Sequence, residues 1–126
     1  MTATAYMRTR SLIQKVDEAH IKQGHVNYYN GVGDLDLQHL FEERDEQKRI
    51  ITTYAAEHGI IIEKWMEDGG RIPIAWKSLF AEPITDIILV RSYRDVAAYP
   101  FVYQAMMNNL SRRGIKLVSC LQNVSN

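Results

Sequence analysis

The chain has 126 residues, of which 46% are hydrophobic and 24% charged, and its acidic and basic residues balance to a formal net charge of +0. This length and composition predict one globular domain with one core, covering residues 1–126. The balanced charge argues against a protein that holds nucleic acid chiefly through its phosphates, because such proteins are usually basic.

No apolar run approaches the ~18 residues that a membrane-spanning helix needs, and the N-terminus lacks the pattern of a secretory signal. The single cysteine, Cys120, has no partner for an internal disulfide, which favours a reducing compartment. The sequence therefore predicts a cytoplasmic protein without a membrane partner.

The first half of the chain alternates between apolar patterns and a polar stretch rich in glycine and asparagine. Glycine and asparagine favour loops, so this stretch predicts an inserted loop or flap over about 24–36. The apolar spacings around it predict two helices, the second stopped by Gly59. In chain order we expect a strand over Thr4–Arg8, a helix over Ser11–Lys22, a loop over Gly24–Gly33 and a long helix from Asp34 or Asp36 to about His58.

In the second half, β-branched and aliphatic runs alternate with helical spacing. The expected elements are a strand over Ile60–Trp65, a turn over Asp68–Gly70, a helix over Ile74–Ala81, a strand over Asp86–Val90, a helix over Pro100–Arg113 and a strand over Ile115–Leu121. The residues expected to face the core from the two helices are Trp76, Leu79, Phe80, Phe101, Val102, Ala105, Met106 and Leu110. Alternating strands and helices predict an α/β fold, a three-layer sandwich around a mostly parallel sheet of about four strands.

Two arginines lie where the first strand ends: Arg8 is its last expected residue, and Arg10 is in the loop that follows. In open α/β folds, chemistry sits just outside the carboxyl ends of the strands. Two cations at that edge would form a positive pocket suited to phosphate or another anion.

These pieces together resemble the N-terminal catalytic domain of serine recombinases, the resolvase and invertase family. The resemblance implies a resolvase-like sheet with strand order 2-1-3-4. It is carried by five segments that occur in the family's order: Tyr6–Arg10, Gln47–Gly59, Ile62–Gly70, Asp86–Ser92 and Leu110–Ser119.

The chain departs from the family at the residues that would carry its chemistry. In the family, a serine of the first motif attacks a DNA phosphate and forms a phosphoserine link, but Arg10 stands in its place here. A guanidinium stays protonated and cannot attack in this way. The family's Asp-Arg-Leu-x-Arg motif aligns with Arg94–Ala98, where the Asp-Arg pair is reversed and the last arginine is an alanine. Arg8 is retained, and Arg71 could match a further family arginine.

Three functional hypotheses follow. The first is a catalytically inactive recombinase-like domain that binds or regulates a protein partner, or associates with itself, with a link to DNA recombination or a mobile element. The second is an active strand-transfer enzyme that uses Ser11 as a fallback nucleophile, although Ser11 fits a helix cap better. The third is a phosphate- or anion-binding module built from Arg8, Arg10, Arg71 and Arg94, which could instead pair with Asp68, Asp86, Asp95 or Glu67.

Other candidate residues have simpler interpretations. Cys120 is expected to be a buried structural thiol, and the histidines have no spacing that would assemble a metal site, so no metal or cofactor is expected. Without a separate DNA-binding region, DNA contact should be weak. The aromatic residues Tyr93, Tyr99, Phe101 and Tyr103 fit a core better than a surface, but any exposed part is a candidate interface.

Overall fold

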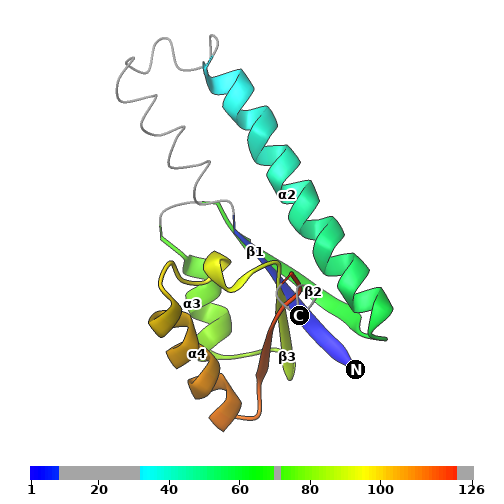
Figure 1. Ribbon diagram of the computed structural model, residues 1–126, viewed down its shortest axis with the longest axis vertical. Coiled ribbons are helices and arrows are strands. Elements are labelled where there is room, and N and C mark those ends of the chain that lie inside the picture. The colour runs from blue at the N-terminus through cyan, green and yellow to red at the C-terminus, as the bar shows by residue number, and fades with distance from the viewer. Residues whose placement is uncertain (9–31, 70–71, 122–126) are drawn as a thin grey trace.

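The computed structural model places a four-stranded sheet between helices (Figure 1). It describes residues 1–8, 32–69 and 72–121, with only the helix backbone described for 32–42. The elements are β1 (Thr2–Arg8), α2 (Val32–Glu57), β2 (Ile61–Asp68), α3 (Ile74–Ala81), β3 (Ile87–Val90), the 3-10 turn η1 (Tyr93–Asp95), α4 (Pro100–Arg112) and β4 (Lys116–Ser119).

All described strand pairs are parallel, and the order in the sheet is β2-β1-β3-β4. This confirms the predicted α/β class, the parallel sheet and the resolvase-like strand order. The short aliphatic run of β3 is buried at every position, as a central parallel strand requires.

Successive side chains of a strand point to opposite faces of the sheet, so the core consists of two layers, one on each face. Ala3, Ala5 and Met7 of β1 pack in the cluster that contains Ile51 and Ala55 of α2. Tyr6, which points to the opposite face, packs in the cluster that contains residues of α3 and α4, among them Trp76, Leu79 and Leu110. The sheet is thus covered by α2 on one face and by α3 and α4 on the other, which is the predicted three-layer sandwich (Figure 1).

Some boundaries differ from the predictions. α2 begins at Val32, so residues 32–36 are helical and do not belong to the predicted loop or flap. The rest of that flap, and the predicted helix over Ser11–Lys22, lie outside the described residues. β2 continues to Asp68, which was assigned to the turn, because it stays in register with Arg8 of β1.

The predicted core stripe of α4 is wrong at two positions. Phe101 is 75% exposed and Ala105 is also exposed, whereas Leu110 is fully buried and Val102 and Met106 are half-buried. The helix is rotated so that its contact with the sheet runs through Leu110, and the face that carries Phe101 and Ala105 points to solvent.

Candidate functional site

The carboxyl edge of the sheet brings together residues from three strands. Arg8, the last residue of β1, is the register partner of Asp68, the last residue of β2. Arg91 follows directly after β3, the other neighbour of β1. Arg8 and Asp68 are both buried, at 5% and 7% exposure, so this edge is a packed polar cluster.

The backbone of Arg8 is held by a side chain of α2. Gln47 is fully buried, and its Oε1 accepts the Arg8 N–H at 3.0 Å while its Nε2 donates to the Arg8 carbonyl at 2.8 Å. These two bonds satisfy the peptide groups of a strand end. They hold the last residue of β1 in place against α2.

Asp68 joins β1, β2 and α3. Its Oδ2 accepts from the hydroxyl of Tyr6 at 2.6 Å and from the Trp76 N–H at 2.9 Å, while Oδ1 accepts from the Ala75 N–H at 2.8 Å. The carboxylate therefore satisfies free N–H groups in the first turn of α3, where the helix dipole favours negative charge. Burial and the adjacent Asp68 raise the pKa of Tyr6 well above its ordinary value, and nearby Arg8 partly opposes this. Tyr6 remains a neutral donor to Asp68.

Arg91 is held by two carboxylates. Its Nη2 lies 2.7 Å from Asp95 Oδ1 and its Nε donates to Asp95 Oδ2 at 3.2 Å, a bidentate pair. Nη2 also lies 3.6 Å from Glu43 of α2. Burial raises the pKa of Glu43, an effect that Arg91 opposes. Asp95, buried at 7% exposure, also accepts from the Ser92 N–H in the capping box of η1.

The structure describes two of the four arginines predicted to form an anion pocket, Arg8 and Arg94, so the pocket as a whole stays a prediction. Arg8 is buried beside Tyr6 and Asp68, whereas Arg94 is exposed and makes no ion pair with any described residue. Arg10, Ser11 and Arg71 lie outside the described residues. Of the predicted carboxylate partners, Asp95 binds Arg91, and Glu67 pairs with Arg44 at 2.9 Å.

Sequence reasoning missed Arg91 and Gln47. The position of Arg91, directly after the aliphatic run of β3, was a usable signal because strand ends meet at this edge. Gln47 gave no signal, since it sits among charged residues in a pattern typical of an exposed helix face.

Cys120 is fully buried, as predicted, and burial raises the pKa of its thiol to about 12. Among the described residues, no group of His, Cys, Asp or Glu side chains could hold a metal ion. No described helix has the length and apolar character needed to cross a membrane.

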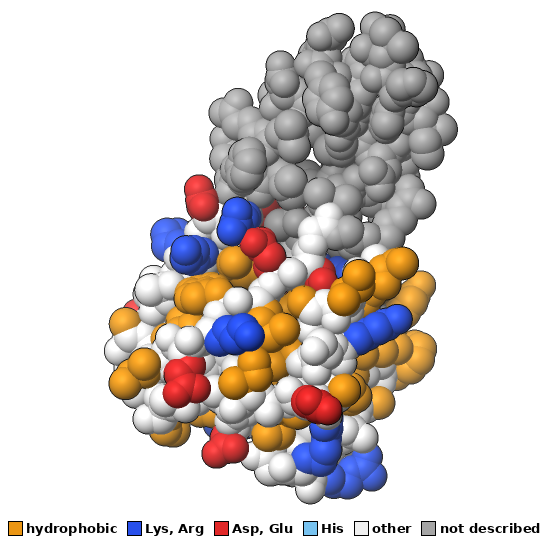
Figure 2. Space-filling model, turned by 180° about the vertical axis from the view of Figure 1, so that it is seen from behind, with side chains coloured by type: hydrophobic (Ala, Val, Ile, Leu, Met, Phe, Trp, Pro, Cys, Tyr) orange, Lys and Arg blue, Asp and Glu red, His pale blue; other side chains and the backbone are white. Residues whose placement is uncertain are grey.

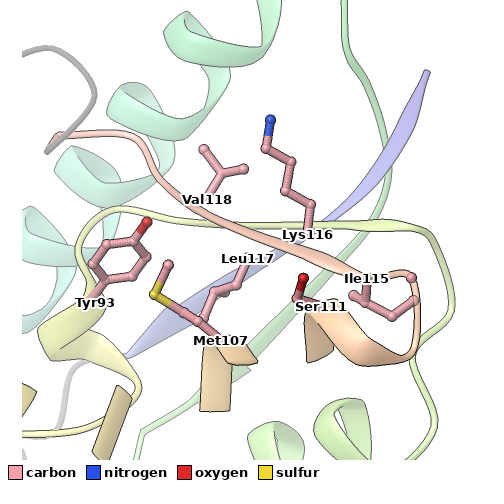
Figure 3. A pocket seen from close by; sticks show the side chains of 8 residues that line it. Tyr93, Met107, Ser111, Ile115, Lys116, Leu117 and Val118 are labelled. Atoms are coloured by element: carbon pink, nitrogen blue, oxygen red, sulfur yellow. The ribbon is translucent and has the colours of Figure 1, made fainter. Parts of the chain in front are cut away.

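A groove of about 540 Å³ is lined by residues of α4 and β4 and by Tyr93 of η1, and none of the four predicted arginines lines it. Figure 3 shows Leu117 on the same side of β4 as Met107, with Lys116 and Val118 on the other side. Lys116 is the one charged residue among those that line the groove, and no carboxylate or histidine lines it. The polar side chains that line the groove are Tyr93, Ser111 and Lys116.

The fold is similar to that of known recombinases, although the sequence itself matches no protein-family model and no curated protein. The N-terminal catalytic domain of TP901-1 integrase superposes with a TM-score of 0.63 at 14% identity, covering 97% of this chain and 78% of that one. The C-terminal catalytic domains of two IS607-like serine recombinases, ISC1926 TnpA and IS1535 TnpA, give TM-scores of 0.62 and 0.59 at 15% identity, covering 95% of this chain and 70% of each. At these identities the likeness establishes the fold.

Proposed function

We propose that this chain, which has the fold of a serine recombinase catalytic domain, does not carry out strand exchange and works as a binding or regulatory module. Its partner would be a recombinase, another protein of a mobile element or a second copy of itself. The proposal depends on the chemistry of the carboxyl edge, where the family's reaction takes place.

The observation that carries the proposal is the environment of Arg94 and Asp95. In the family motif an Asp-Arg pair stands here, and the order is reversed in this chain. Asp95 is buried and holds Arg91 in a bidentate pair, while Arg94 is exposed. Phosphoryl transfer needs cations aimed at the charge that develops on the phosphate. An arginine held by Asp95 and Glu43 does not supply this.

The first motif supports the same conclusion. Arg10 occupies the position that the resemblance assigns to the attacking serine, and a permanently protonated guanidinium has no lone pair for attack. The nucleophile and its surrounding arginines act as a unit, so the loss of several members removes activity rather than weakening it.

The test is incubation of the full chain with end-labelled duplex and supercoiled DNA, followed by denaturing electrophoresis. We expect no nicking and no label that migrates with the protein. A covalent adduct that disappears in Ser11→Ala would overturn the proposal and establish the enzyme that uses Ser11. A matched Ser92→Ala variant, altered in the cap of η1, controls for effects on the fold.

A phosphate-binding module is the alternative function. The burial of Arg8, which is 5% exposed, argues against it, because an anion from solution would have to reach a side chain that is almost fully covered.

A further inference from the structure

β4 lies at one edge of the described sheet, where it pairs with β3 alone. The N–H of Lys116 donates to the Asp86 carbonyl at 2.8 Å, and the N–H of Cys120 donates to the Val90 carbonyl at 2.9 Å. Backbone groups of successive strand residues point to opposite sides, so the N–H and the carbonyl of Leu117 point away from β3. This edge therefore presents a donor and an acceptor to a further strand.

The groove of about 540 Å³ follows this edge. Every residue from Gly114 to Val118 lines it, and the other lining residues come from α4 and η1. Side chains from both faces of β4 take part, with Leu117 and Met107 on one side and Lys116 and Val118 on the other (Figure 3). A groove that is lined from both faces of a strand lies beside its edge, which is where a neighbouring strand belongs.

A second hollow, of about 380 Å³, lies between α2 and the end of β4. Ile50 and Tyr54 of α2 line it together with Cys120, which follows β4. Side chains of an extended peptide alternate between the two faces of a sheet. A strand beside β4 would therefore find a hollow on each face, and such pockets give strand addition its specificity.

The opposite edge of the sheet is less suited to a partner strand. On β2 the charged side chains of Glu63, Lys64 and Glu67 are all exposed. Charges along an edge strand are a common protection against pairing with another chain. β4 carries one charged residue, Lys116. Of the two edges, β4 is the better template for an added strand.

The charge of the groove indicates the kind of peptide that fits it. Lys116 lines the groove, is exposed and makes no ion pair with another described residue. No acidic residue lines the groove. Arg94, which follows the lining residue Tyr93, is also exposed without a described ion-pair partner. A peptide with an acidic residue near Lys116 is therefore favoured over a neutral or basic one.

We propose that an extended segment of another protein, apolar at alternate positions and acidic opposite Lys116, adds as a further strand to the edge of β4. A nucleic-acid strand is a poorer occupant, because its phosphates only accept hydrogen bonds and would leave the Leu117 carbonyl without a donor. The backbone bonds are few, so the dissociation constant should lie between roughly 10 and 500 µM. The proposal adds a partner class to the binding module but does not depend on the absence of catalysis, so peptide binding and DNA cleavage can fail separately.

The test begins with a displayed library of random peptides of about 12 residues, selected against the full chain. The most frequent peptide is synthesised with a fluorescent label, and its dissociation constant is measured by anisotropy. We expect apolar residues at alternate positions, at least one Asp or Glu, and an affinity in the range given above.

Methylation of the peptide's amide nitrogens, one at a time, tests whether it binds as a strand. Methyl groups on the amides that face β4 should weaken binding at least about fivefold, because each removes a donor from the backbone pairing. Methyl groups on the intervening amides should change the affinity less than about twofold. A period of two residues in this series is the signature of strand addition.

Lys116→Glu should weaken binding at least about threefold, because it replaces an attraction by a repulsion. A peptide with lysine in place of its acidic residue should bind this variant as the original peptide binds the wild type. The matched control is Lys64→Glu, the same substitution at an exposed position of the other edge strand, which should leave the affinity unchanged.

The proposal is overturned if no selected peptide binds more tightly than 1 mM, or if the methylation series shows no period of two. It is equally overturned if Lys64→Glu weakens binding as much as Lys116→Glu, or if the exchanged peptide fails to recover. Displacement of the peptide by a single-stranded oligonucleotide, with loss of oligonucleotide binding in Lys116→Glu, would assign the groove to nucleic acid instead.

Discussion

Adjacent residues have opposite environments at the end of β3. Asp95 is buried, neutralises Arg91 and caps η1, while Arg94 extends into solvent. At the end of β2, Asp68 accepts hydrogen bonds from the Tyr6 hydroxyl of β1 and from two backbone N–H groups of α3. The polar residues described at this edge stabilise the ends of secondary structures. These contacts support the proposal that the edge has a structural role rather than a catalytic one.

A substitution of Gln47 tests how much its two hydrogen bonds to the Arg8 backbone contribute to stability. Gln47→Leu should lower the free energy of unfolding by about 2–4 kcal/mol, because it leaves the N–H and carbonyl of Arg8 buried without their partners. Urea denaturation measures the change. Thr52→Ala, at an exposed position of the same helix, should cost less than about 0.5 kcal/mol. A loss below 1 kcal/mol for Gln47→Leu would show that water or other groups satisfy that peptide.

The residues of this edge were only partly predictable from the sequence. Asp95 and Glu67 do pair with arginines, but with Arg91 and Arg44, which were not among the arginines predicted to meet them. Which arginine meets which carboxylate depends on strand register and on the turn of η1, and neither is visible in a local pattern. The burial of Gln47 depends on how α2 lies across β1, a contact between residues 39 positions apart.

At the scale of elements, two glycines end two helices in the same way. Gly59 and Gly114 have φ values of 65° and 78°, and the residue after each donates to a carbonyl five residues earlier, Ile60 to Ala55 and Ile115 to Leu110. Both stops were predicted from sequence, as was most of each strand, because local signals determine them. The rotation of α4 was not predicted, because Phe101 and Leu110 are equally apolar and only packing distinguishes them.

Gly114 provides the test of these helix ends. Gly114→Ala should lower the free energy of unfolding by about 1 kcal/mol, since an alanine is strained at positive φ. The added Cβ meets no atom within 4 Å, so the cost is conformational rather than steric. Gly114→Asn should cost less, because asparagine tolerates this region better. Thermal unfolding followed by circular dichroism would contradict the assignment if the alanine variant were as stable as the wild type.

At the scale of the whole molecule, the acidic and basic residues balance in number. The chain carries 15 basic and 15 acidic residues, and on the face seen in Figure 2 the basic and acidic side chains are interspersed among hydrophobic ones. Such a surface creates no strong field to attract a polyanion. The fold class and strand order could be predicted from the alternation of elements and from the family resemblance. The burial of the described arginines and their ion-pair partners could be seen only in the structure.

The central claim is that the carboxyl edge has a structural role, with Arg91 held by Asp95 and Glu43 and with Arg8 buried beside Tyr6 and Asp68. Calorimetric titration of the full chain with inorganic phosphate tests it most directly, with Arg8→Ala as the comparison. We predict no saturable binding tighter than roughly 1 mM in either protein. Saturable binding below that concentration, abolished by Arg8→Ala, would contradict the claim and indicate a working anion site.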